Sequence, residues 1–229
     1  MLLKTQSPKE LVPRFFEKTA CTYDKIVNLT TFGRDKYWKN EIIKKIPNCS
    51  SVLDLACGTG ILTFRIAEKL PDAKILGVDI TESYLEIAQK KLKPHQKVSF
   101  LCQDAEKLNL DQKFDCITSS YIPKYCKDEA LIKICLNHLN PGGKIVLHDF
   151  TYPKNKIVRS LWNIYFVVLH MVGYLLPQWK DVFVDLPKLI RKSRWLDDYE
   201  NTMNKYDLQV DKKSLTLHTS SILTGIKTI

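Results

Sequence analysis

Several features that would assign the sequence to other protein classes are missing from it. It contains no internal repeat and no low-complexity segment, which excludes repeat arrays and extended disorder. Its seven cysteines include no Cys-x-x-Cys pair, so we expect no metal ion and no redox site. The first ten residues lack the apolar core of a signal peptide. We therefore expect a cytoplasmic protein with reduced cysteines in its core, such as Cys102, Cys116 and Cys135.

The composition fits one soluble domain. The chain has 229 residues, of which 45% are hydrophobic and 26% charged, enough to bury a single substantial core. Its net charge of +10 would suit nucleic acid or an anionic membrane surface. Because the lysines are spread along the chain, without an arginine-rich block or an appended RNA module, we expect no nucleic-acid partner. The same positive charge would favour peripheral contact with an anionic membrane surface at least as well.

The segment 52–63 is the most informative in the chain. A buried apolar run leads into Cys-Gly-Thr-Gly and then into a helical pattern. Gly58 and Gly60 allow positive φ and let backbone amides approach a ligand. A second apolar run ends at Asp79, where a carboxylate can accept hydrogen bonds from both hydroxyls of a ribose. The alternative is that Asp79 only caps the helix that follows it.

Two sequence features that this turn lacks limit the kinds of ligand it can bind. Thr63 occupies the position at which a dinucleotide-binding turn has its third glycine, which argues against NAD or FAD. No Gly-Lys-Ser/Thr follows, so a P-loop is excluded. The turn therefore favours an adenosine-containing cofactor without phosphates.

Strand and helix patterns alternate over the central hundred residues. We predict strands near 51–56, 74–78, 97–102, 114–119 and 143–149, and helices near 60–70, 81–92 and 128–138. This alternation predicts a doubly wound α/β sheet, with Gly58, Asp79, Asp104 and Ser120 converging at the carboxyl ends of its strands. Helices near 9–20 and 35–46 form an N-terminal cap. Another near 194–205 precedes antiparallel closing strands at 208–211 and 215–224.

Residues 157–176 are the most apolar stretch of the chain. Arg159, Asn163, His170 and Gly173 interrupt it, which argues against a membrane span. Two interpretations stay open: a helix packed on the sheet that contributes to a homodimer, or a mobile lid over a hydrophobic substrate that dips into a bilayer. Pro177 and Pro187 are expected to break the structure that follows.

Four motifs in order resemble those of class I S-adenosylmethionine-dependent methyltransferases. They are Leu53-Asp-Leu-Ala-Cys-Gly-Thr-Gly60, Gln103-Asp-Ala-Glu-Lys-Leu108, Phe114-Asp-Cys-Ile-Thr-Ser-Ser120 and Leu139-Asn-Pro-Gly-Gly-Lys-Ile-Val-Leu147. The segment Phe15-Phe-Glu-Lys-Thr-Ala-Cys-Thr-Tyr-Asp24, with Phe32-Gly33 and Tyr37-Trp-Lys39, resembles the opening of the ubiquinone/menaquinone biosynthesis C-methyltransferases. The resemblance implies a Rossmann-like, seven-stranded sheet in one domain. Within it we expect a cap (1–47), a cofactor-binding core (48–150), an apolar helical lid (151–206) and closing strands (207–229).

The resemblance also implies a cofactor and its ligands. S-adenosylmethionine (SAM) would be converted to S-adenosylhomocysteine. Asp79 would hold the ribose, Asp104 and Ala105 would meet the adenine, and Ser120 would face the reaction centre. The full set of expected cofactor-binding residues is Tyr23, Lys39, Asp54, Ala56, Gly58, Gly60, Thr63, Asp79, Ile80, Asp104, Ala105, Ser119 and Ser120.

The residues that would activate the acceptor depart from the family's pattern. The quinone enzymes carry an arginine after the fourth strand, where this chain has Tyr121-Ile-Pro-Lys124. Lys124 could bind an oxyanion as a point charge, and His148 could serve as a base where the family has Glu. We expect Lys124, His148 and Tyr121 to carry catalysis on a small hydrophobic ring compound, such as a prenylated quinol. The alternatives are another small acceptor, a non-catalytic SAM-binding subunit, and RNA methylation.

Overall fold

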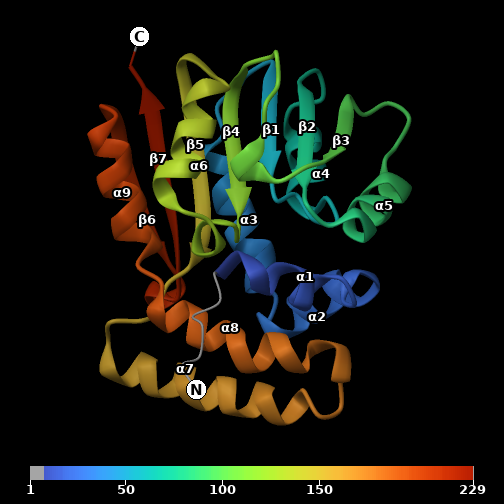
Figure 1. The fold of residues 1–229 in the computed structure, drawn as a ribbon, viewed down its shortest axis with the longest axis vertical. Coiled ribbons are helices and arrows are strands. Elements are labelled where there is room, and N and C mark those ends of the chain that lie inside the picture. The colour runs from blue at the N-terminus through green and yellow to red at the C-terminus, as the bar shows by residue number, and fades with distance from the viewer. Residues whose placement is uncertain (1–7, 229) are drawn as a thin grey trace.

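A computed structural model describes residues 8–228 of the chain, and a seven-stranded mixed sheet lies at its centre (Figure 1). The helices and strands are α1 (Leu11–Phe16), α2 (Tyr23–Thr30), α3 (Arg34–Lys45), β1 (Ser51–Leu55), α4 (Ile61–Lys69), β2 (Lys74–Asp79), α5 (Glu82–Lys91), β3 (Val98–Cys102), β4 (Phe114–Ser120), α6 (Asp128–Asn137), β5 (Leu139–Phe150), α7 (Lys156–Val172), α8 (Lys180–Lys192), α9 (Trp195–Lys205), β6 (Leu208–Leu215) and β7 (Ser220–Lys227).

The strands follow the order β3-β2-β1-β4-β5-β7-β6. Strands β1 to β5 pair in parallel, whereas β7 is antiparallel to both β5 and β6. Strand order reverses between β1 and β4, and ligands bind beyond the carboxyl ends of the strands at such a point. The predicted doubly wound, seven-stranded α/β sheet with antiparallel closing strands is confirmed.

Both faces of the sheet are buried, which explains why its parallel strands are almost continuously apolar. In β1, Leu53 and Leu55 join a core cluster with α6 and α9, while Val52 joins another with α3 and α4. Successive side chains of a strand point to opposite faces, so one short run of residues supplies both layers. The glycine turn is thereby held between two packed cores.

A further layer covers the carboxyl ends of the strands. Helices α7 and α8 pack on each other below the sheet, with α1 and α2 between them and the strands (Figure 1). Trp162 and Phe166 of α7 and Phe183 of α8 form a third cluster with Phe15. Of the two interpretations left open for this segment, packing on the sheet does not describe α7, because its main contacts among the described residues are with α8 and this third cluster, beyond the carboxyl ends of the strands (Figure 1). Within residues 8–228, no helix is both long and apolar enough to cross a membrane.

Two predicted boundaries also differ from the structure. Pro187 lies inside α8 and does not break it, because the helix buries its apolar face, Pro187 included, at the cost of one backbone hydrogen bond. The second closing strand begins at Ser220, not at 215. Residues 216–218 form a turn in which all three have positive φ, and Leu215 ends β6.

Two more expectations need correction. The helix predicted near 9–20 is shorter, because α1 ends at Phe16, and the unpredicted α2 begins at Tyr23, so the described part of the cap holds the three α-helices α1, α2 and α3. Cys102 was expected in the core but is exposed, since β3 is the edge strand of the sheet. Cys116 and Cys135 are buried as expected, and all seven cysteines are free thiols.

Candidate active site

A cavity of about 160 Å³, here called the cofactor pocket, opens at the carboxyl ends of β1, β2 and β4. It forms at the point where strand order reverses, as the fold requires. Most of the predicted site residues line it. They are Tyr23, Lys39, Asp54, Ala56, Gly58, Asp79, Ile80, Asp104, Ala105, Ser120 and Tyr121.

The glycine turn shapes one wall of this pocket. Gly58 has a φ of +56° and Gly60 a φ of +80°, conformations that side chains rarely adopt. A Cβ added to Gly60 would lie 2.6 Å from the ring of Phe64, so the position has no room for one. Gly60 itself does not line the pocket; it precedes the first residue of α4. Gly60 instead turns the chain so that Gly58 lines the pocket.

Asp79 links the turn to the helix that follows β2. Its Oδ2 accepts a hydrogen bond from the Gly58 amide and its Oδ1 accepts one from the Thr81 amide, each at 2.8 Å. Burial raises the pKa of Asp79 above its usual value. A carboxylate has about four acceptor sites, so Asp79 retains capacity for ligand hydroxyls in the pocket that it lines. Bracing the start of α5 and binding a ribose are therefore compatible.

Asp54 is the most deeply buried carboxylate of the pocket. Only 1% of its surface is exposed, and this burial raises its pKa to about 7. Thr63 Oγ1 donates a hydrogen bond of 2.6 Å to Asp54 Oδ2. Thr63 is fully buried and does not line the pocket, so it acts on a ligand only by orienting Asp54.

Asp104 is held from the cap. Lys9 Nζ donates to both of its carboxylate oxygens at 2.6 Å, and the Glu106 amide donates to Oδ1 at 3.0 Å. Lys9 also lines the pocket but was not predicted. No sequence signal could have found it, because it lies 95 positions from its partner.

A second cavity of about 710 Å³, here called the apolar chamber, lies beside the first. Residues of α2, α7 and α8 form half of its lining. Four residues line both cavities and form a shared wall: Phe16, Tyr23, Tyr121 and Tyr125. Among the described residues, neither the Tyr23 nor the Tyr125 hydroxyl has a hydrogen-bond partner. Both hydroxyls are therefore available to a ligand at the boundary between the two cavities.

Tyr121 sits at this boundary in a strained conformation. Its φ of +79° lies in the left-handed region, which is unfavourable for a bulky side chain. Its ring stacks on Phe150 at 4.8 Å, and its hydroxyl donates to Asp35 Oδ1 at 2.7 Å. Lys39 Nζ donates to the same oxygen at 2.5 Å. Burial raises the pKa of Tyr121 well above its usual value, so the phenol stays neutral.

Lys124 borders the apolar chamber, not the cofactor pocket. Its Nζ donates to Asp149 Oδ1 and to the Tyr121 carbonyl, both at 2.7 Å, and lies 4.5 Å from the centre of the Tyr125 ring. Burial lowers the pKa of Lys124, and the Asp149 carboxylate opposes this shift. The pair places a buried cation beside the chamber.

His148 and Ser119 line neither cavity. The imidazole is fully buried between Ser120 Oγ, 2.9 Å from Nδ1, and Ser220 Oγ, 2.6 Å from Nε2. Burial lowers the pKa of His148 to about 3, so the ring is neutral near pH 7. Ser119 donates to the Leu55 carbonyl and joins β4 to β1. His148 can influence a ligand only through neighbouring residues, such as Ser120, to which it is hydrogen-bonded, and Tyr121, whose ring centre lies 5.1 Å from that of the imidazole.

Several lining or supporting residues were missed from the sequence. Phe16, Tyr84 and Tyr125 line the cofactor pocket, and Asp35 anchors Tyr121 and Lys39. The spacing of Asp35 and Lys39, four positions apart on a predicted helix, could have identified that ion pair. The aromatic residues carry no comparable signal, because core aromatics show the same pattern.

A doubly wound sheet, a glycine turn without the dinucleotide fingerprint, and carboxylates after β2 and β3 define a class I SAM-dependent methyltransferase. The sequence model of the ubiE/COQ5 methyltransferase family matches residues 3–227. The chain belongs to this family. The expectations of a methyltransferase and of SAM as its cofactor are thereby confirmed.

Curated relatives agree with this assignment. The chain is 30% identical over 227 residues to the ubiquinone/menaquinone biosynthesis C-methyltransferase UbiE of Hahella chejuensis, covering 94% of this chain and 91% of the relative. It is 31% identical over 169 residues to the demethylmenaquinone methyltransferase of Lactococcus lactis, covering 71% and 67%.

Solved structures share the fold at lower identity. The plantazolicin methyltransferase BpumL, solved in complex with SAH, has a TM-score of 0.63 and 15% identity over 97% of this chain and 98% of that one. The magnesium protoporphyrin IX methyltransferase of Synechocystis PCC 6803, with bound SAH, has a TM-score of 0.63 and 17% identity over 96% and 100%.

Proposed function

We propose that the chain transfers the methyl group of SAM to a ring carbon of a prenylated quinol. The observation that carries the proposal is the shared wall between the cofactor pocket, which Asp54, Asp79 and Asp104 line, and a much larger apolar chamber. A ring at the wall would meet the methyl donor while an isoprenoid tail fills the chamber. The printed names of the relatives, which refer to ubiquinone, menaquinone and demethylmenaquinone, support the same class of acceptor.

The pocket offers groups for each part of the cofactor. Asp79 would accept hydrogen bonds from the ribose, Asp104 and the Ala105 backbone would meet the adenine, and Asp54 would attract the charged aminoacyl end. The unpartnered Tyr23 hydroxyl and ring would face the sulfonium, to which an aromatic face contributes about 1 kcal/mol. When bound, SAM supplies an electrophilic methyl group, and the protein contributes mainly alignment.

Methylation of a ring carbon requires electron density from a neighbouring hydroxyl. The Lys124 ammonium, held by Asp149 beside the chamber, would stabilise the phenolate that forms there. The Tyr125 hydroxyl would donate a hydrogen bond to the same oxygen. Tyr121, whose hydroxyl donates its hydrogen bond to Asp35, would position the ring by contact.

In this proposal His148 is not the base that was expected from the sequence. Because the buried ring is neutral and lines neither cavity, we propose that it positions Ser120 and does not remove the acceptor proton. Ser120 lines the cofactor pocket and Ser119 ties β4 to β1. The hydroxyl proton would leave through solvent at the chamber. Once the methyl group has moved from sulfur to the ring carbon, that carbon would lose its own proton and the ring oxygen would be protonated again, so that one proton in all is released with S-adenosylhomocysteine.

A substrate panel tests the proposed function. Purified protein would be given SAM and quinols with the same ring, either with or without a prenyl tail, in detergent. We expect methylation of the ring carbon, with kcat/KM at least about tenfold higher for the tailed acceptor, since each buried methylene contributes about 0.8 kcal/mol. Equal kcat/KM for both, or methylation of oxygen only, would contradict the proposal. Asp79→Ala serves as the control that loses cofactor binding.

Such an acceptor is dissolved in a membrane, so we also propose that the protein acts as a peripheral protein at a bilayer surface. Its basic net charge of +10 is consistent with this. A homodimer remains the alternative use of the apolar segment.

A further inference from the structure

Helix α7 carries an apolar stripe that the protein itself does not cover. The stripe consists of Ile157, Leu161, Ile164, Val168 and Met171 of α7 and Leu175 in the turn that follows it, whose exposed fractions run from 47% to 81%. Alternating spacings of four and three residues place the five helical residues on one side of α7. The opposite side, with Trp162, Phe166 and Leu169, is buried in the third core cluster. Contiguous exposed apolar surface of this kind marks an interaction site.

The apolar chamber opens beside this stripe. Five residues both line the chamber and are exposed at the surface, and they mark its mouth: Phe32, Arg34, Leu161, Ile164 and Leu217. Phe32 is 79% exposed and Leu217 is 72% exposed, although both are large apolar side chains. Leu161 and Ile164 belong to the stripe and to the mouth alike. An apolar molecule could therefore pass from the stripe into the chamber without crossing water.

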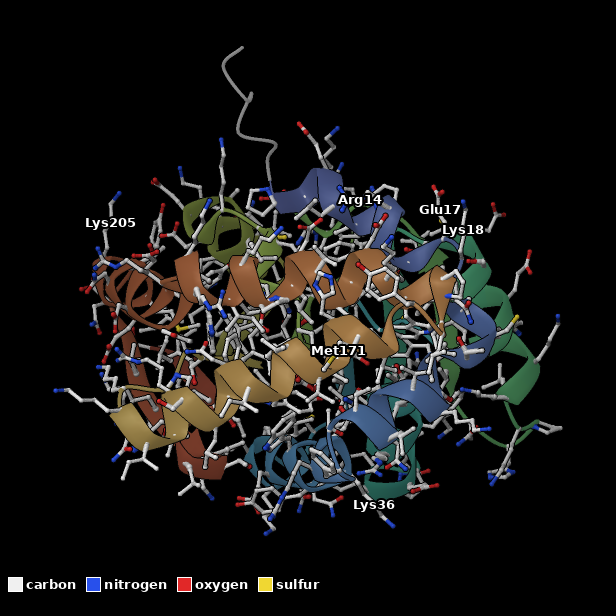
Figure 2. The ribbon with its side chains drawn as sticks, turned by 90° about the horizontal axis from the view of Figure 1, so that it is seen from below. Arg14, Glu17, Lys18, Lys36, Met171 and Lys205 are labelled. Carbon is white, nitrogen blue, oxygen red and sulfur yellow. The ribbon has the colours of Figure 1, made fainter. Side chains whose placement is uncertain are left out.

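Positive charge flanks the stripe at both ends. Residues 150–180 contain no Asp or Glu, whereas Lys154, Lys156, Arg159 and Lys180 lie within them. Figure 2 views the molecule from this side, with α7 and Met171 toward the viewer and Lys36 at the edge. An apolar stripe with basic flanks is the pattern of a helix that lies in the interface of an anionic bilayer.

We propose that the α7 stripe docks on an anionic lipid bilayer and places the chamber mouth at the acyl chains. This inference rests on the proposed function only for the identity of the lipophilic acceptor, because the docking surface is defined independently of that function. A second copy of the chain is a less suitable occupant. A two-fold contact through α7 would give Lys154, Lys156 and Arg159 no acidic partner, because residues 150–180 contain no Asp or Glu.

Flotation with lipid vesicles tests the proposal in the absence of cofactor and acceptor. We expect the protein to bind vesicles of phosphatidylcholine with phosphatidylglycerol, and to bind pure phosphatidylcholine more weakly. The variant V168S/M171S, which changes the stripe without touching either cavity, should bind at least about tenfold less. K154E/K156E should weaken binding to the anionic vesicles by a similar factor.

The control variant K74E/K113E makes the same charge change at the opposite ends of the strands and should bind vesicles like the unaltered protein. SAM affinity, measured by calorimetry, should be unchanged in all three variants, which shows that they are folded. Wild-type protein that stays unbound with anionic vesicles would overturn the proposal. So would a dimer that V168S/M171S converts to monomer, since the stripe would then be covered by a second copy. Failure of quinol methylation in detergent would leave vesicle binding intact and would count against the proposed function alone.

Discussion

Burial sets the protonation of the titratable groups around the site. Asp54 and His148 are shifted in opposite directions from their usual pKa values, and desolvation is the larger cause for both. The carboxyl tends to keep its proton and the imidazole tends to lose one, because each favours its neutral form away from water. At pH 7 the pocket therefore holds a carboxyl group near its midpoint of titration.

Cofactor affinity should consequently depend on pH. Asp54, with a pKa of about 7, is neutral below that pH and negative above it, so affinity for the cationic cofactor should rise through pH 7 and level off above it. Asp54→Asn should lower the affinity at pH 8 by about tenfold or more, as expected for the loss of one charge-assisted hydrogen bond. The variant should also lose the pH dependence. Calorimetric titration between pH 6 and 8.5 measures both effects, and unchanged affinity would contradict the placement of Asp54 at the aminoacyl end.

Lys124 combines structural and catalytic roles that two variants separate. Lys124→Met leaves the Asp149 carboxylate buried without its partner and should destabilise the protein by about 3 to 5 kcal/mol. The double variant K124M/D149N removes both charges and should recover much of the free energy of unfolding, measured in urea. Methyl transfer should stay low in both, because neither presents a cation to the acceptor. A stable double variant with normal kcat would exclude Lys124 from catalysis.

His148 should affect the rate without controlling its pH dependence. Its pKa of about 3 lies far below the working range, so it does not titrate there. His148→Gln, which keeps a hydrogen-bonding side chain for Ser120, should lower kcat by less than about tenfold. The shape of the kcat profile between pH 5.5 and 8 should be the same in both proteins. If the kcat profile of the unaltered protein has a limb that is missing in His148→Gln, His148 would be the base.

Among the elements, the turn between β1 and α4 depends most strictly on its sequence. Gly60→Ala would place a Cβ against the Phe64 ring at a φ of +80°, and should cost about 1 to 3 kcal/mol of stability together with cofactor affinity. The variant G60A/F64L removes the contact but keeps the unfavourable φ, so it should recover only part of the loss. Thermal unfolding with and without SAM measures this. Full recovery would show that φ at this position is unimportant.

The sequence predicted those elements whose local pattern agrees with their packing. Strands β1 to β4, the glycine turn and Asp79 were found because apolar runs, turn residues and strand-end carboxylates coincide. Pro187 was misjudged because burial of α8 outweighs the local preference of proline. The position of α7 stayed open between two interpretations, because periodicity shows that a helix has an apolar face but not what that face contacts. Within the site, Tyr125 and Lys9 act through contacts between segments distant in sequence, for which a single sequence carries no signal.

At the scale of the whole molecule, three features lie in a line: the cofactor pocket, the shared wall and the apolar chamber that opens beside α7. The wall is assembled from α1, α2 and the segment after β4, so it exists only in the folded chain. The layer of α7 and α8 lies on the side of the molecule toward which the carboxyl ends of the parallel strands point (Figure 1). A lipophilic acceptor could therefore reach the methyl donor from one face while the cofactor is held at the sheet.

The central claim is that one chain aligns SAM with a ring carbon of a prenylated quinol. Its most direct test is nuclear magnetic resonance of the product formed from SAM with an isotope-labelled methyl group, a demethylated quinol and the purified protein. The account predicts that the label appears on a ring carbon, and that Asp79→Ala abolishes its transfer. Label on a quinol oxygen, or no transfer by a protein that binds SAM, would contradict it.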